Sequence, residues 1–226
     1  DTIDEHTKLF LLCNPHNPVG RVFSRQELTD MAEICLANDM YIASDEIHCD
    51  LVLDGRQHTP IASISPEIAE RTVTLMAPSK TFNIAGLQCS FAIVPNENLR
   101  KAMSKARAGM VPDVNVMGYT AALAAYKYGD PWLKDLLVYL AENRDYAASF
   151  IEAEMPGVHM SPLEGTYLAW LDCRETRLGD RPDVFFCEQA RVAMTSGTFF
   201  GPGGEGYCRF CLGSPREQVV EALKRM

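Results

Sequence analysis

The first half of the chain alternates short apolar runs with polar, turn-forming segments. Residues 9–13, 40–44, 73–77 and 90–94 are apolar runs of strand length. After the first run, Ser24 and Glu27 have the spacing of a helix capping box, and apolar residues follow at helical intervals to Leu36. Residues 98–108 and 119–128 also show helical spacing. This pattern predicts an α/β layer that extends to about residue 130.

The second half of the chain begins with a longer helical pattern. Pro131 stands in the first turn of a predicted helix whose apolar residues recur on one face. From Met155 onward, short strands (166–171 and 207–212) alternate with helices (183–193 and 215–224). We therefore predict three parts: residues 1–130 belong to a large domain, residues 131–155 form a connecting helix, and residues 156–226 form a small α+β domain.

Charge and cysteine usage narrow the class of protein. The 226 residues include 21 basic and 30 acidic ones, so the net charge of -9 argues against a general nucleic-acid or membrane binder. No apolar run approaches the length of a membrane span. Most of the eight cysteines lie in apolar runs, which favours reduced thiols and a cytoplasmic location. Cys208 and Cys211 have CxxC spacing, but in a strand they point to opposite faces, which favours packing over a metal site.

Three polar residues stand near the carboxyl ends of predicted strands. Asn17, Asp45 and Lys80 each follow a different strand, and ligands of open α/β sheets bind outside such strand ends. A lysine held in a pocket can attack a carbonyl and carry pyridoxal phosphate, a cofactor that also requires a carboxylate at its ring nitrogen. From the spacing alone, ordinary loop charges or a structural ion pair remain the favoured interpretation of Lys80 and Asp45.

Four segments together resemble a known enzyme family. The segments "NPHNPVG", "SDEIHCD", "APSKTFNIAGLQ" and "YCRFCLGSPREQVVEAL" occur in this order. They resemble the class I/II aminotransferase family of pyridoxal-phosphate enzymes, and most of all its MalY/PatB-type branch of cystathionine β-lyases. The resemblance implies an α/β protein of PLP-transferase fold type I, with an incomplete α/β/α large domain plus a small α+β C-terminal domain. It also implies the cofactor pyridoxal 5'-phosphate, an amino-acid substrate and a homodimer.

The resemblance assigns roles to individual residues. Lys80 matches the lysine that binds the cofactor covalently and moves protons at the substrate Cα. Asp45 matches the aspartate at the pyridinium nitrogen, and Asn17 matches a hydrogen-bond donor to the phenolate oxygen of the cofactor. His48 lies where many aminotransferases carry a tyrosine that serves this oxygen. Ser79 matches a ligand of the phosphate.

Arg209 matches the arginine that binds the substrate α-carboxylate, for which its planar, two-pronged donor is suited. Structural roles compete with several of these assignments. Asn17 could cap a turn, Ser79 could be solvated in a loop, and His48 could satisfy a local hydrogen bond. A structural salt bridge is the main alternative for Arg209.

Two departures from the family pattern bear on function. Gln88 stands where aminotransferases carry an arginine on the cofactor phosphate, and Asn83 replaces a glycine. With His48, these residues favour a lyase, which eliminates a thiol from an S-substituted amino acid and leaves pyruvate and ammonia, over the alternative of an aminotransferase. The segments of the family that precede the strand at residue 9 have no counterpart, so the chain resembles the C-terminal half to two-thirds of a family protein. A fragment that is not catalytically competent by itself is the third hypothesis.

Overall fold

The computed structural model describes residues 3–226, which divide into two compact units. The first unit contains the residues up to Pro15, Val22–Asp50 and Gln57–Leu133. The second unit contains His16–Arg21, Leu51–Arg56 and Lys134–Met226. Two short loops of the N-terminal half therefore pack with the C-terminal half. The predicted division at residues 130 and 155 stays a prediction.

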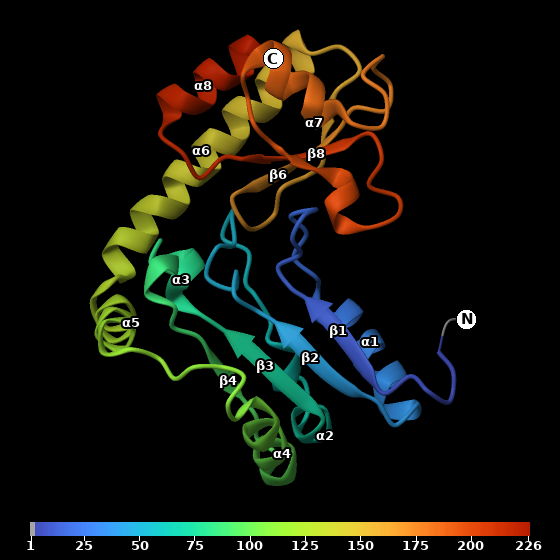
Figure 1. The fold of residues 1–226 in the computed structure, drawn as a ribbon, viewed down its shortest axis with the longest axis vertical. Helices are drawn as coiled ribbons and strands as arrows, with labels where there is room; N and C mark the ends of the chain where they lie inside the picture. The colour runs from blue at the N-terminus through green and yellow to red at the C-terminus, as the bar shows by residue number, and fades with distance from the viewer. Residues whose placement is uncertain (1–2) are drawn as a thin grey trace. The chain divides into compact units, whose positions relative to one another are not determined.

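The first unit is built on a four-stranded sheet, labelled in Figure 1. Its strands are β1 (Leu9–Cys13), β2 (Tyr41–Asp45), β3 (Thr72–Met76) and β4 (Phe91–Ile93), in the order β1-β2-β3-β4. The first three strands are parallel, and β4 pairs antiparallel with β3. The strand predictions are confirmed, with boundaries that differ by a single residue or none at each end. Parallel strands bring their carboxyl ends to the same edge of the sheet.

Helices cover one face of this sheet. Helix α1 (Arg25–Ala37) begins at the predicted capping box, in which Ser24 and Glu27 bond each other's backbone N–H groups. Apolar side chains of α1, of a 3-10 helix at Ile61–Ser63 and of α2 (Pro66–Glu70) form a core with β1 and β2. Helices α3 (Pro78–Thr81), α4 (Glu97–Arg107) and α5 (Val116–Tyr128) follow. The helical spacing predicted α4 and α5 but not the short α2 and α3.

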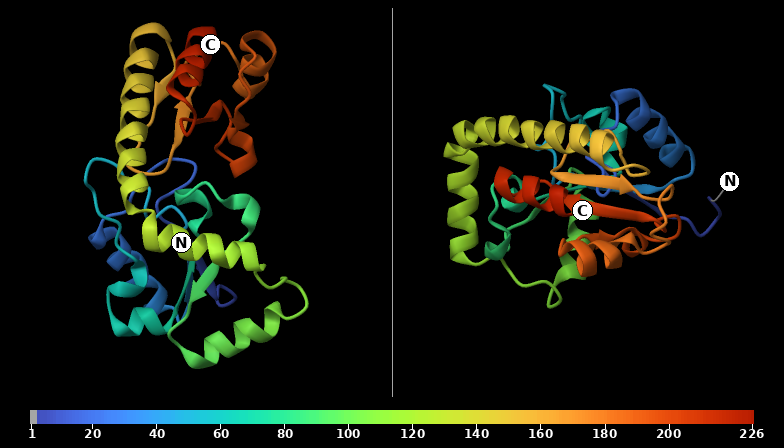
Figure 2. Two further views of the ribbon diagram at one scale, coloured as in Figure 1. Left: turned by 90° about the vertical axis from the view of Figure 1, so that its left-hand side faces the viewer. Right: turned by 90° about the horizontal axis from the view of Figure 1, so that it is seen from above.

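The second unit combines a long helix with an antiparallel sheet. Helix α6 (Asp130–Glu154), drawn as one continuous helix in Figure 2, belongs to the second unit from Lys134 onward. The sheet contains β5 (His159–Met160), β6 (Leu168–Asp172), β7 (Thr195–Ser196) and β8 (Tyr207–Cys211), in the order β5-β6-β8-β7. Helix α8 (Arg216–Arg225) lies beside α6, because the Arg216 N–H donates to the Tyr139 hydroxyl. None of the helices among residues 3–226 is long and apolar enough to cross a membrane.

The structure corrects two boundaries in the second unit. The helix predicted at 183–193 is a short α7 (Pro182–Phe185) followed by a π-helical turn at Phe186–Ala190. It ends earlier than predicted because Arg191 adopts a left-handed φ of 57°. Similarly, the strand predicted from residue 166 starts at Leu168, since Thr166 has a φ of 69°. The two-residue strands β5 and β7 are too short to produce an alternating pattern.

Candidate active site

Two neighbouring strand ends of the first unit carry the predicted cofactor residues. Asp45 is the last residue of β2, and its register partner on the parallel strand β3 is Leu75. β3 ends one residue after Leu75 and leads directly into α3, whose residues include Ser79 and Lys80. Asp45 and the helix that carries Lys80 therefore follow adjacent strands at the same edge of the sheet. This edge is where ligands bind in open α/β sheets.

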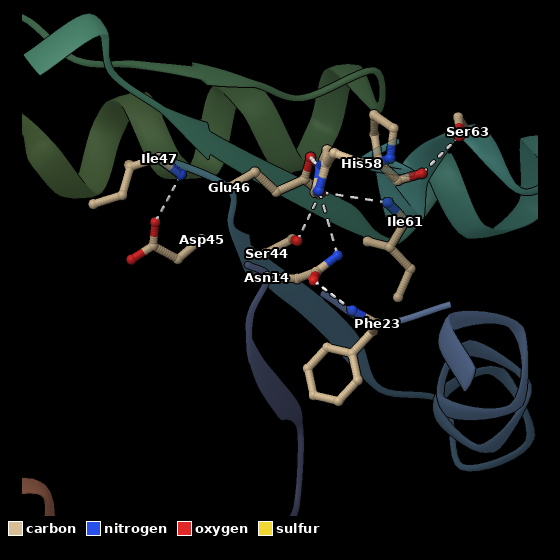
Figure 3. A network of polar contacts seen from close by, with 10 residues as sticks. Asn14, Phe23, Ser44, Asp45, Glu46, Ile47, His58, Ile61 and Ser63 are labelled. Atoms are coloured by element: carbon tan, nitrogen blue, oxygen red, sulfur yellow. Dashed lines mark hydrogen bonds and ion pairs between the residues drawn. The ribbon is translucent and has the colours of Figure 1, made fainter. Parts of the chain in front are cut away.

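The Asp45 carboxylate is half-buried and held by the turn that follows it. Its Oδ1 accepts a hydrogen bond from the Ile47 N–H at 3.2 Å, as Figure 3 shows. The backbone carbonyl of Asp45 accepts from the N–H of Asn14 at 3.0 Å. The first contact fixes the turn after β2, and the second joins the end of β2 to the loop after β1.

A buried polar network lies beside Asp45, and the sequence reasoning missed it. The Glu46 side chain is 2% exposed, and its Oε2 lies 2.8 Å from the His58 Nε2. The other oxygen, Oε1, accepts from the Ser44 hydroxyl at 2.8 Å and from the Ile61 N–H at 3.3 Å. Figure 3 shows these groups converging on the Glu46 carboxylate. Alternation could have indicated it, because Ser44 and Glu46 fall on the same buried side of β2 as Ile42.

Asn14 extends this network to the loop after β1. Its Oδ1 accepts from the Phe23 N–H at 3.0 Å, which orients the amide so that Nδ2 faces the His58 Nδ1 at 3.5 Å. With Nδ1 facing the Asn14 amide, His58 has its Nε2 directed at the Glu46 carboxylate. The Glu46 carboxylate thus contacts the His58 imidazole and accepts from two further donors.

The segment after Asp45 also contacts the helix that carries Lys80. The Thr81 hydroxyl is buried and donates to the Asp50 Oδ2 at 3.0 Å. His48, in the same segment, is 2% exposed. Burial raises the pKa of the Cys49 thiol to about 12, so the thiolate that a nucleophile requires is disfavoured. Ser79 and Lys80 themselves are half-buried.

The second unit brings Asn17 and Arg209 into direct contact. The Arg209 Nη1 donates to the Asn17 Oδ1 at 2.7 Å, although the two residues are 192 positions apart in the sequence. Burial lowers the pKa of Arg209. No acidic side chain among residues 3–226 forms an ion pair with Arg209, so the structure does not support a structural salt bridge there. A half-buried guanidinium without a carboxylate partner is suited to an anionic ligand.

The two departures from the family pattern lie in a tight turn after α3. Asn83 has a φ of 54° and Gln88 a φ of 52°, both in the left-handed region. Asparagine is among the few residues that tolerate this region, which explains how it can replace a glycine at position 83. Both side chains are exposed. Gln88 offers an amide but no charge to an anion.

The arrangement therefore contains an amine, a carboxylate and a hydroxyl at one sheet edge, and an amide–guanidinium pair in the second unit. Among residues 3–226, no group of three or more histidine, cysteine, aspartate or glutamate side chains could hold a metal ion. Cys208 is buried and Cys211 is exposed, as expected for neighbours at i and i+3 in a strand. These are the residue types that a site for a covalently bound carbonyl cofactor requires.

Comparisons with known proteins agree with this chemistry. The family model of aminotransferase class I and II matches residues 1–226. The chain is 42% identical to cystathionine beta-lyase PatB of Bacillus subtilis, over 99% of this chain and 58% of that protein. Cystalysin from Treponema denticola, whose structure contains a pyridoxal 5'-phosphate cofactor, has a TM-score of 0.95 at 36% identity, covering 98% of this chain and 57% of that one.

A third solved structure is a PLP-bound putative aminotransferase from Clostridium difficile 630. It has a TM-score of 0.93 at 43% identity and covers 96% of this chain and 57% of that one. The fold resemblance predicted from the sequence motifs is confirmed. The chain spans somewhat more than half the length of the relatives that it matches.

Proposed function

Because the chain belongs to the aminotransferase class I and II family, we propose that the complete protein is a pyridoxal-phosphate-dependent carbon–sulfur β-lyase. It would act on an S-substituted amino acid such as cystathionine and release a thiol, pyruvate and ammonia. The 42% identity to the PatB lyase supports this activity. The observation that carries the proposal is that Asp45 ends β2 and that Lys80 lies in the short helix directly after the adjacent parallel strand β3, at the same edge of the sheet.

The residues at this edge have the donor set that the cofactor requires. Lys80 offers an amine for the cofactor aldehyde, Asp45 a carboxylate for the ring nitrogen, and Ser79 a hydroxyl for the phosphate. His48 is placed in the same segment as Asp45 and would serve the phenolate oxygen. When bound, pyridoxal phosphate supplies an electron sink for the pair released at the substrate Cα.

The chain's own groups would then act by proton transfer and by binding. Lys80 would remove the proton at the substrate Cα. Asp45 would keep a proton on the ring nitrogen by charge and hydrogen bonding. The Asn17 Oδ1 is used by Arg209, so its Nδ2 would serve as the donor to the phenolate oxygen. Arg209 would bind the α-carboxylate of the substrate through its remaining N–H groups.

Replacement of Lys80 by alanine tests the proposal. We expect the Lys80→Ala variant of the complete protein to form pyruvate from L-cystathionine at least about 100-fold more slowly, since a positioned acid–base group contributes this much or more. The visible absorbance of covalently bound cofactor should also disappear. The exposed Lys101, which pairs with Glu97, provides the matched control Lys101→Ala and should leave both readouts unchanged. Normal turnover in Lys80→Ala would end the proposal.

Amino transfer is the second candidate function. It is favoured by the likeness to the PLP-bound putative aminotransferase, at 43% identity. In that reaction Lys80 would move the proton from the substrate Cα to the cofactor, and no thiol would leave from Cβ. Incubation with L-cystathionine while pyruvate is assayed, compared with incubation with a 2-oxo acid while a new amino acid is assayed, separates the two functions.

The assembly and the competence of the 226-residue chain are further parts of the proposal. We infer a homodimer in the cytoplasm, from the family resemblance and from the eight free cysteines. Sedimentation of the complete protein measures the number of copies. A cofactor titration followed by absorbance, on the 226 residues alone and on the complete protein, tests whether this part binds the cofactor without the rest.

A further inference from the structure

The Arg209 guanidinium is held on three sides within the second unit. Its Nη1 donates to the Asn17 Oδ1 at 2.7 Å, and its Nη2 donates to the Thr195 hydroxyl at 3.2 Å. Its Cζ lies 4.9 Å from the centre of the Phe200 ring. A cation at this distance from an aromatic face is attracted to it. These contacts fix both the position and the plane of the guanidinium.

The neighbours of Arg209 are themselves placed by the sheet. On β8, Arg209 is directly paired with Trp170 of β6 and with Thr195 of β7, so the three residues form one row across three strands. The Trp170 ring meets the Phe200 ring edge to face, with centroids 5.6 Å apart. Trp170 is 8% exposed and also stacks on Tyr207 at 5.1 Å. Phe200 is thus backed by a buried aromatic side chain.

The charge of Arg209 is left uncompensated by this arrangement. The neighbours that it contacts, Asn17, Thr195 and Phe200, are all uncharged, and no acidic side chain among the described residues is paired with it. A guanidinium has five N–H donors, of which these hydrogen bonds use two. The remaining three are available to an anion, and two parallel donors match a carboxylate.

We propose that Phe200 and Thr195 are positioning residues that set the affinity of Arg209 for the substrate carboxylate. This inference rests on the proposed function, in which Arg209 binds that carboxylate. Thr195 accepts a hydrogen bond from Nη2, and the Phe200 ring packs against the face of the guanidinium. The guanidinium therefore loses little rotational freedom when the ligand binds. Without them the arginine would sample orientations in which only one N–H reaches the carboxylate.

Replacement of Phe200 by leucine tests the aromatic contact. Leucine keeps an apolar side chain against Trp170 but offers no aromatic face to the guanidinium. In the complete, cofactor-loaded protein, titration with L-alanine followed by cofactor absorbance should show a dissociation constant about 3- to 30-fold higher. The KM for L-cystathionine should rise similarly while kcat changes little. The affinity for the cofactor itself should not change.

Phe199 provides the matched control. It is the adjacent phenylalanine, its ring lies 5.5 Å from that of Phe200, and it is 79% exposed with no contact to Arg209. The Phe199→Leu variant should bind L-alanine as the parent protein does. If Phe200→Leu and Phe199→Leu bind L-alanine equally well, the positioning role of Phe200 is overturned.

The hydroxyl of Thr195 is tested by a pair of variants. Thr195→Val keeps the shape and removes the acceptor, and should weaken L-alanine binding about tenfold. Thr195→Ser keeps the acceptor and should restore binding, which a merely structural effect of the substitution would not do. This pair also carries the test if Phe200→Leu fails to fold. Equal binding by the valine and serine variants would contradict the inference.

A carboxylate-free probe and a variant of Arg209 distinguish a failure of the proposed function from a failure of the positioning roles of Phe200 and Thr195. Ethylamine has the amine of L-alanine without the carboxylate, so its binding should be the same in the parent and in all of these variants. Arg209→Lys should weaken L-alanine binding at least as much as Phe200→Leu. Normal L-alanine binding by Arg209→Lys would overturn the role of Arg209 in the proposed function. If Arg209→Lys binds L-alanine weakly but the Phe200 and Thr195 variants bind it normally, only the positioning roles of Phe200 and Thr195 are overturned.

Discussion

At the scale of single residues, Glu46 shows how a buried acidic side chain is accommodated. Its carboxylate accepts hydrogen bonds from the Ser44 hydroxyl and the Ile61 N–H, and it contacts the His58 imidazole at 2.8 Å. A buried carboxylate without such donors would be strongly destabilising. The network also joins the chain after β2 to the loop after β1, through Asn14. These hydrogen bonds of Glu46 therefore stabilise the turn that follows Asp45.

Replacement of Glu46 by glutamine should destabilise the complete protein by about 3 kcal/mol. The amide keeps the shape of the side chain but places an NH2 group against donors, which leaves them unsatisfied. Urea unfolding measures the change. Glu175→Gln is the control, because Glu175 and His159 form a comparable pair at 3.2 Å that is 75% and 63% exposed. That change should be below about 0.5 kcal/mol, and equal losses in the two variants would contradict the role of the network.

At the scale of secondary-structure elements, α6 combines buried apolar side chains with polar side chains that hydrogen-bond to distant segments. Leu140, Ala147 and Ile151 are buried on the predicted apolar face. Arg144 also lies on this face and pairs with Asp54 through two hydrogen bonds of 2.6 and 2.8 Å. Asn143, which the apolar pattern did not select, is fully buried. Its Nδ2 donates to the carbonyl oxygens of Leu212 and Ser214, at 2.9 and 3.1 Å.

Asn143 thus links α6 by hydrogen bonds to the segment directly after β8, the strand that carries Arg209. Replacement of Asn143 by leucine would leave two backbone carbonyls unsatisfied, one of them deep in the unit. We expect a loss of about 2–4 kcal/mol in the free energy of unfolding of the complete protein. Asn98→Leu, at an exposed position of α4, is the control and should change stability little. A fully stable Asn143→Leu variant would show that these hydrogen bonds contribute nothing net.

At the scale of the whole molecule, the two units differ in how their carboxylates are paired. Asp54, Asp172 and Asp183 all belong to the second unit, and each has a lowered pKa because of hydrogen bonds to an arginine side chain. For Asp172 the pKa falls from 3.8 to about 2. A carboxyl group with a lowered folded-state pKa stabilises the fold above its unfolded-state pKa, and this contribution is lost as the pH falls through the folded-state value.

We therefore expect acid to weaken the second unit between about pH 4 and pH 2. Trp170 allows the measurement, because it belongs to the second unit, whereas Trp132 belongs to the first. In the complete protein with every tryptophan except Trp170 replaced by phenylalanine, the urea midpoint reported by Trp170 fluorescence should fall over this pH range.

The corresponding aspartate variants test the cause of this pH dependence. Asp54→Asn, Asp172→Asn and Asp183→Asn combined should flatten it, because asparagine does not titrate. Asp39→Asn serves as the control, since Asp39 pairs with Arg71 in the first unit. An unchanged pH dependence in the triple variant would contradict the assignment to these pairs.

The sequence by itself determined the regular elements and the edge of the sheet at which the candidate cofactor residues lie. Strand and helix periodicity, the capping box at Ser24 and the positions of Asp45 and Lys80 at strand ends are local properties, readable from residues close together in the chain. The four motifs then identified the family, because their order and spacing are specific. The sequence pattern did not predict irregular features such as the π-helical turn at Phe186–Ala190, since no local period indicates them.

Only the tertiary structure decided which distant groups meet. Nothing in the local pattern joins Asn17 to Arg209 across 192 positions, or places Phe200 under the guanidinium. The pairing of Glu46 with His58 likewise depends on both side chains being buried together. Such contacts follow from strand pairing and from the requirement that buried polar groups be satisfied, and these conditions apply only once the chain has folded. The sequence therefore predicts the elements that carry the chemistry, while the fold determines which neighbours hold each reactive group in place.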